Sequence, residues 1–250
     1  MNERYLQTIK IDWDLIPHSS YLHQISALRH LTELELESNI VFFVGENGTG
    51  KSTLLEAIAI AYGFNPEGGS RNFTFSTRDT HSPLHTAIRL IKGPRSPKTG
   101  YFLRAESFYN VATKADEYES KLPDLFSRAG KKSYHQLSHG ESFLALMQGT
   151  FSPKGIYFLD EPEAALSPQR QLTLLLHLLE LAKAGAQFVI ASHSPILLAA
   201  PGAILLSFDD GRLHPCTYEE TESYQVTEMF INHRDYFLAH LMEDENETIF

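Results

Sequence analysis

The stretch Gly45-Glu46-Asn47-Gly48-Thr49-Gly50-Lys51-Ser52 matches the phosphate-loop pattern GxxxxGK[ST] at every position. It follows the apolar run 39–44, which favours a short buried strand, and precedes the helix-forming run 53–61. Glycines let such a loop turn tightly and aim its N–H groups at an anion, and the next helix adds its positive dipole end. The alternative is a glycine-rich turn without a ligand, against which the flanking strand and helix argue.

This loop predicts a site for ATP and Mg²⁺. We expect Lys51 to reach the β- and γ-phosphates and the Ser52 hydroxyl to bind the metal. The predicted nucleotide-binding residues of this segment are Gly45, Glu46, Asn47, Gly48, Thr49, Gly50, Lys51, Ser52 and Thr53.

A second apolar run, 155–159, ends in the adjacent acids Asp160 and Glu161. Burying a charge without a partner is costly, so acids at the carboxyl edge of a parallel sheet usually handle a cation or a water molecule. We expect Asp160 to hold Mg²⁺ and Glu161 to polarise the attacking water as general base. The alternative is a strand that ends in two solvated acids.

Two shorter motifs complete the pattern. Leu137-Ser138-His139-Gly140-Glu141 precedes the helix-like run 143–147, and by itself it also fits a helix N-cap with a capping box. The run 189–191 predicts another buried strand, which ends in Ser192-His193-Ser194. A lone histidine at a strand end is often only a structural hydrogen-bonding group, but His193 stands where a γ-phosphate sensor is expected.

Taken in order, the phosphate loop, LSHGE, the YFLDE strand and the ASHS histidine resemble the head of an ATP-binding-cassette (ABC) ATPase. The stretch DEPEAALSPQRQ, residues 160–171, resembles stand-alone ATPases related to the chromosome-maintenance and DNA-repair branch. The resemblance implies an α/β P-loop fold with a mainly parallel core sheet, an antiparallel edge sheet and a small helical lobe. It also implies a Mg²⁺-dependent enzyme that converts ATP and water to ADP and phosphate.

The same resemblance implies a homodimer that forms on ATP binding and holds two nucleotides between its subunits. Ser138 and Gly140 would contact the γ-phosphate bound by the partner subunit, and His193 would contact the γ-phosphate in its own subunit. Catalytic roles then fall to Glu161, His193 and Lys51.

Three departures from the family pattern stand out. In the signature, His139 and Glu141 replace a glycine and a glutamine, and Ser167 replaces an aspartate further along. The glutamine expected between loop and signature is absent. Glu106 is its positional stand-in as a third candidate Mg²⁺ ligand, and the alternative is an ordinary acid at a strand end.

Length and composition favour one domain over residues 1–250, with a partner-facing lobe at about 64–140. The single cysteine, Cys216, excludes an intramolecular disulfide and any cysteine-cluster metal site. No stretch reads as a secretory leader or a membrane span. We therefore expect a cytoplasmic protein without membrane insertion.

Outside the motifs, runs 5–11 and 31–37 favour the strands of the edge sheet. Ser167-Pro168 opens a predicted helix, ending at Gly185, that we expect to be largely buried through Leu172, Leu175, Leu176 and Leu179. The sequence Asp209-Asp210-Gly211-Arg212 predicts a hairpin turn.

Charge is distributed unevenly along the chain. Residues 62–140 hold 12 Lys and Arg against 7 Asp and Glu, whereas the remainder holds 9 against 24. A nucleic-acid partner is one interpretation of the basic segment, and a solvated lobe is the other. Eight of the 12 basic residues fall in two groups: Arg89, Lys92, Arg95, Lys98 and Arg104, and then Arg128, Lys131 and Lys132.

Three functional settings follow. The first is an ATPase switch in nucleic-acid transactions or phage defence, acting on an unknown protein partner. The second is the soluble motor subunit of a membrane transporter. The third is a non-hydrolysing nucleotide switch or a P-loop kinase, against which Glu161, His193 and the signature argue.

Overall fold

The computed structural model describes residues 4–70, 82–104, 144, 147–164 and 166–247. A seven-stranded sheet with strand order β10-β9-β3-β8-β7-β6-β4 forms its centre. Strands β9, β3, β8, β7 and β6 are mutually parallel, and β10 and β4 are antiparallel edges. The predicted α/β class with a mainly parallel core sheet is therefore confirmed. The strand bounds are β3 Ile40–Val44, β4 Gly69–Ser70, β6 Thr99–Leu103, β7 Gly155–Asp160, β8 Gln187–Ala191, β9 Ile204–Ser207 and β10 His214–Cys216.

The three middle strands are apolar because both faces of the sheet are covered. Every residue of β3 and β8 is buried, as are the first five of β7. Successive side chains point to opposite faces, so Val41 and Phe43 enter one apolar core while Ile40, Phe42 and Val44 enter the other. The carboxyl ends of these parallel strands meet at one edge of the sheet.

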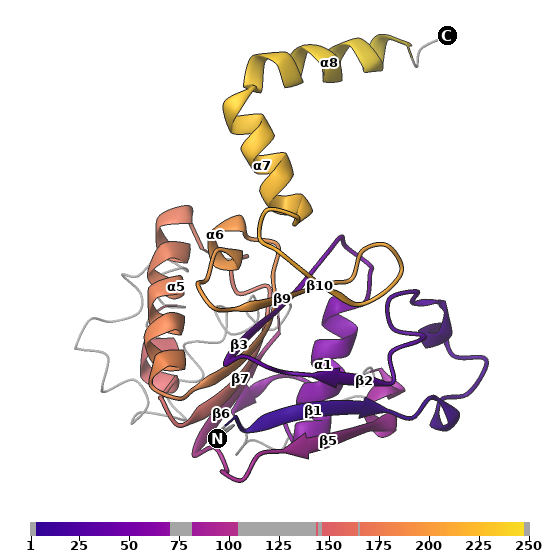
Figure 1. Cartoon of the computed structure of the whole chain (residues 1–250), viewed down its shortest axis with the longest axis vertical. Coiled ribbons are helices and arrows are strands. Elements are labelled where there is room, and N and C mark those ends of the chain that lie inside the picture. Colours follow the sequence, from indigo (N-terminus) through magenta and orange to yellow (C-terminus); the bar gives the residue numbers. More distant parts are fainter. Residues whose placement is uncertain (1–3, 71–81, 105–143, 145–146, 165, 248–250) are drawn as a thin grey trace.

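An antiparallel three-stranded sheet with order β2-β1-β5 lies beside the first core, as Figure 1 shows. Its strands are β1 Leu6–Ile11, β2 Glu33–Glu35 and β5 Ile88–Lys92, so the predicted strand at 31–37 is real but shorter. Gln187 of β8 joins the two sheets. Its side-chain amide donates to the Leu6 carbonyl (2.7 Å) and accepts from the Leu6 N–H (2.9 Å) in a fully buried position.

Helix α1, Lys51–Tyr62, packs in the first core against both sheets. Helix α5, Pro168–Lys183, and the short α6, Pro195–Leu198, cover the opposite face. Three 3-10 helices lie on the first side: η1 Trp13–Leu15, η2 Tyr21–Gln24 and η3 Pro83–Ala87.

The predicted buried face of α5 is wrong in part. Leu172 and Leu176 are 52% and 62% exposed, whereas Leu174, Leu178 and Leu181 pack on the sheet. Leucines occupy both sides of this helix, so local sequence does not select the face. The i, i+4, i+7 spacing of the buried set is that of one helical stripe.

Two consecutive helices, α7 Glu222–Asn232 and α8 Arg234–Glu247, extend away from the body of the molecule (Figure 1). We refer to them as the C-terminal arm. Helix α7 has no buried residue, and the arm exposes a set of large apolar side chains: Val226, Met229, Phe230, Ile231, Tyr236, Leu238 and Leu241. None of the helices in the described part of the chain has the length and apolar character needed to span a membrane.

Candidate functional site

The predicted phosphate loop connects β3 to α1. Gly45, Gly48 and Gly50 all have positive φ, in the region that side chains other than glycine rarely adopt. At Gly50 a Cβ would lie 2.6 Å from the Ile25 side chain, and at Gly45 it would lie 2.8 Å from Asp209 Oδ1. Both backbone conformation and close packing therefore require glycine at these two positions.

Lys51 begins α1 and folds back over the loop. Its Nζ donates to the carbonyl oxygens of Gly45 (2.7 Å) and Glu46 (2.6 Å). Burial lowers the pKa of Lys51, while the carboxylates of Glu161 and Asp209 oppose this shift. The ammonium group is thus held by the backbone of the loop itself.

Ser52 and Asp160 come together although 108 residues separate them in the chain. The Ser52 hydroxyl donates to Asp160 Oδ1 at 2.8 Å. Burial raises the pKa of Asp160 to about 6; the Ser52 hydrogen bond opposes the shift, and the neighbouring Glu161 carboxylate adds to it. Two adjacent oxygen ligands, one of them a carboxylate destabilised by burial, fit a hard divalent cation such as Mg²⁺.

Glu161 and His193 follow the ends of β7 and β8, which pair in parallel up to Asp160 and Ala191. Glu161 adopts a φ of 46°, and its N–H donates to the Ala191 carbonyl at 2.9 Å. His193 Nε2 lies 3.8 Å from Glu161 Oε1. Burial and the nearby Lys51 charge lower the pKa of His193, which favours its neutral form. The sheet register therefore brings these two predicted catalytic residues together.

Two acids that sequence reasoning left without a role contact this site. Glu163 Oε1 accepts hydrogen bonds from Ser192 Oγ and from the N–H groups of His193 and Ser194. Asp209, which we expected only in a hairpin turn, accepts the Glu46 N–H at 3.0 Å. The available signal for Glu163 was that it is the third acid of residues 160–163, the segment that contains Asp160 and Glu161. The sequence around Asp209 gave no signal of its contact with Glu46, because it reads only as a turn.

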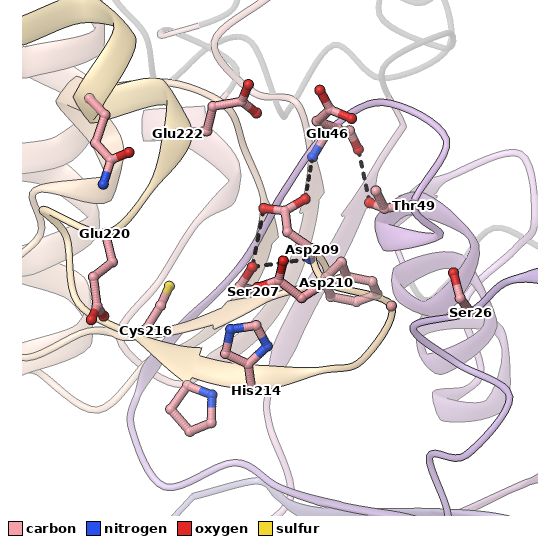
Figure 2. A pocket seen from close by; sticks show the side chains of 14 residues that line it. Ser26, Glu46, Thr49, Ser207, Asp209, Asp210, His214, Cys216, Glu220 and Glu222 are labelled. Carbon is pink, nitrogen blue, oxygen red and sulfur yellow. Dashed lines mark hydrogen bonds between the residues drawn. The ribbon is translucent and has the colours of Figure 1, made fainter. Parts of the chain in front are cut away.

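An open pocket of about 670 Å³ lies on the outer side of the loop, between Glu46, the β9–β10 hairpin and the start of α7 (Figure 2). Five of its lining residues are acids: Glu46, Asp209, Asp210, Glu220 and Glu222. These carboxylates disfavour a triphosphate in the pocket. Neither Lys51 nor Ser52, the two residues predicted to contact phosphate and metal, lines this pocket.

The predicted residues Ser138, Gly140 and Glu106 lie outside the described residues, as do the departures His139 and Glu141. The basic group at residues 89–104 lies within the described part of the chain, and one of its five side chains, Arg104, faces partners within the protein. Arg104 pairs with Glu56 at 2.9 Å and donates to the Pro66 carbonyl at 2.7 Å. Its guanidinium is therefore engaged within the protein. Arg89, Lys92, Arg95 and Lys98 are exposed, and the Lys92 ammonium lies over the Tyr62 ring at 4.4 Å.

Comparison with known families agrees with this geometry. One family model, described as "AAA domain", matches residues 21–135, and a second, described as "AAA domain, putative AbiEii toxin, Type IV TA system", matches residues 109–199. Between them they cover the phosphate loop, Asp160, Glu161 and His193. Together these matches support a P-loop ATPase of the ABC type.

Similar curated proteins are ATP-binding proteins of transporters. The hemin import ATP-binding protein HmuV of Streptomyces coelicolor is 28% identical over 70% of this ATPase, and that of Nocardia farcinica is 29% identical over 70%. The alignments cover 66% and 64% of those two relatives, slightly less than two thirds of their length. The HmuV of Pseudomonas aeruginosa is 28% identical over 73% of this ATPase and 77% of its own length.

Among solved structures, cbiO1 from Clostridium perfringens, part of the ABC transporter complex cbiONQ, matches with a TM-score of 0.51 and 18% identity. The match covers 96% of this ATPase and all of that chain, which supports the ABC-type fold. The SMC head domain from Thermotoga maritima matches with a TM-score of 0.45 and 15% identity over 85% of this chain and 98% of its own. That score does not separate the chromosome-maintenance branch from the others.

Proposed function

We propose that this ATPase binds ATP with Mg²⁺ at the phosphate loop and hydrolyses it to ADP and phosphate. The observation that carries the proposal is the 2.8 Å contact between Ser52 Oγ and Asp160 Oδ1, next to a lysine already held inside the loop. When bound, Mg²⁺ would neutralise phosphate charge and polarise the γ-phosphate. Ser52 and Asp160 would hold it, and Glu106 is a further candidate ligand.

Glu161 and His193 would carry out the hydrolytic step. Glu161 Oε1 would orient the attacking water and accept its proton, because it is the carboxylate that follows the metal ligand at the strand end. A neutral His193 would donate a hydrogen bond to a γ-phosphate oxygen, which its lowered pKa supports. Lys51 would contribute positive charge towards the β- and γ-phosphates, and the N–H groups of residues 45–53 would surround them.

The family resemblance supports a head-to-tail homodimer that closes on ATP. In that arrangement Ser138 and Gly140 of each subunit complete the site of the other. Closing and reopening would then act as a switch on a partner.

The test uses the Glu161→Gln variant, which retains the site's shape but lacks the proposed base. With ATP and Mg²⁺ it should elute as a dimer and retain intact ATP, and with EDTA it should be a monomer. The matched control is Glu161→Gln combined with Lys51→Ala, which should stay monomeric because it loses nucleotide binding. A Glu161→Gln protein that is monomeric in every nucleotide condition contradicts the dimer. A Lys51→Ala protein with undiminished ATP affinity contradicts the site.

Two settings for the switch have separate support. Exposed Arg89, Lys92, Arg95 and Lys98 on and after β5 support a nucleic-acid partner. The printed names of the curated relatives support a role as the motor subunit of a transporter.

ATP turnover with and without duplex DNA at low salt separates the two settings. Stimulation that salt abolishes supports the first, and an unchanged rate contradicts it. The second setting is supported if a membrane protein co-purifies with the chain and changes its rate of ATP turnover. If wild-type protein binds ATP without hydrolysing it, the non-hydrolysing switch replaces both.

A further inference from the structure

Glu163 occupies a position from which one carboxylate oxygen organises the whole segment after β8. Its Oε1 accepts from Ser192 Oγ (2.8 Å), from the His193 N–H (2.7 Å) and from the Ser194 N–H (3.1 Å). Ser192 and Ser194 are buried, so these contacts are shielded from water. Its other oxygen, Oε2, is buried without a hydrogen-bond partner among the described residues. The hydrogen bonds that this carboxylate accepts from other residues of the described structure therefore come from Ser192, His193 and Ser194.

The burial of Glu163 is costly, and this cost is only partly offset. Burial raises the pKa of Glu163, while the hydrogen bonds from His193 and Ser192 oppose the shift. A buried acid that is destabilised in its charged form adds little to stability. Its contacts act on geometry instead, because hydrogen bonds to a charged acceptor are short and directional.

Glu163 also belongs to the turn that carries Glu161. The Glu161 carbonyl accepts from the Ala164 N–H (3.1 Å), and the Glu161 N–H donates to Ala191 (2.9 Å), so the turn is fixed on both sides. Because Glu163 holds the backbone of His193 from this same turn, it sets the His193 ring against Glu161. The backbone contacts of Glu161 and the hydrogen bonds of Glu163 thus explain how His193 Nε2 and Glu161 Oε1 are kept 3.8 Å apart although the two residues follow different strands.

We propose that Glu163 is a positioning residue for hydrolysis, which acts through His193 and touches neither nucleotide nor water itself. This inference rests on the proposed function, because it assigns His193 a part in turnover. It predicts that loss of Glu163 lowers kcat and leaves ATP binding nearly unchanged, since the phosphate loop and Lys51 lie on a different strand and helix.

The nearest purely structural contact provides a matched control. Gln171 of α5 accepts a hydrogen bond from Ser194 Oγ at 2.6 Å and donates to the Leu166 carbonyl at 3.0 Å. It anchors the same segment from the other side and makes no hydrogen bond to His193 or Ser192 in the described structure. Gln171→Ala should therefore keep kcat within about twofold of wild type, although it too loosens the segment.

The experiment measures steady-state ATP turnover and the affinity for a fluorescent ATP analogue in five variants, of which Gln171→Ala is the control. Glu163→Ala should lower kcat by about ten- to a hundredfold, the value of one to two charge-assisted hydrogen bonds, with KM within about twofold. Glu163→Gln keeps the acceptor oxygen and should recover most of the rate. His193→Ala and the double variant with Glu163→Ala complete a cycle, in which the double variant should be no slower than His193→Ala alone.

Each outcome has a defined meaning. A Glu163→Ala kcat within twofold of wild type, or a further tenfold loss in the double variant, overturns the positioning role and leaves the proposed function intact. A wild type that neither binds nor hydrolyses ATP overturns both. If thermal unfolding shows that Glu163→Ala does not fold, the same cycle is run with Glu163→Met, which fills a similar volume without an acceptor oxygen, and additive losses in it overturn the role in the same way.

Discussion

Asp160 should make the nucleotide-free protein less stable, so its replacement by asparagine should stabilise that state while abolishing hydrolysis. Burial raises the pKa of Asp160 from 3.8 to about 6, which means that the folded chain binds this proton more tightly than the unfolded chain. Between these two pKa values the folded state holds more protons, and stability falls as pH rises. Above about pH 6 the full penalty is present, and well below 3.8 it is absent.

Linkage gives the size of the effect. With those two pKa values the penalty is about 1.6 kcal/mol at pH 5 and about 3 kcal/mol at pH 8. Asparagine has no charge to bury, so the advantage of Asp160→Asn over wild type should grow by about 1.4 kcal/mol between these pH values. Any fixed effect of the amide, such as a changed contact with Ser52, cancels in this difference.

The assay is urea unfolding of wild type and variant at pH 5 and pH 8, with a chelator and without nucleotide. The matched control is Asp210→Asn, which removes the same charge from an exposed turn position whose φ of 59° asparagine also tolerates. That control should show no pH-dependent gain. An Asp160→Asn advantage that is equal at both pH values, or absent at pH 8, refutes the argument that burial of this carboxylate is the cause.

Two further predictions concern contacts between distant parts of the chain. Gln187→Leu should lower the free energy of unfolding by about 2–4 kcal/mol in urea titrations, because the Leu6 N–H and carbonyl both lose their side-chain partner in a buried position. A loss below about 1 kcal/mol would mean that the two sheets do not depend on this link. Asp209→Ala should bind ATP about tenfold more weakly than Asp209→Asn in calorimetry, since both lack the charge but only asparagine can still accept a hydrogen bond from the Glu46 N–H. Equal affinities of the two variants would mean that Asp209 does not position the loop.

Local sequence was sufficient where a residue's role depends on its own element. The loop 45–52, the buried strands β3, β7 and β8, and the start of α5 follow from apolar runs, glycines and proline. The meeting of Ser52 with Asp160 was also predictable, because carboxyl ends of parallel strands share one edge.

Three other tertiary contacts were not predictable from the sequence. Asp209 lies 163 residues from its partner Glu46, and the local sequence of Asp209 reads as a complete turn. Glu163 lies about 30 residues before the segment it holds, and an acid after a strand end reads equally well as solvated. Arg104 was grouped with exposed basic residues because sequence does not reveal its ion pair with Glu56. In each case the partner lies in a segment that is distant in the sequence.

The C-terminal arm should open independently of the rest of the chain. Because α7 buries none of its residues, its contacts with α6 and with the Tyr218 ring add little protection to its backbone hydrogen bonds, and a helix of 11 residues on its own is marginal in water. Its amide hydrogens should therefore exchange with deuterium long before those of β3 and β8. Heating should consequently remove helical signal from the arm first, and the loss of far-UV ellipticity will begin at a temperature where the phosphate loop is still intact.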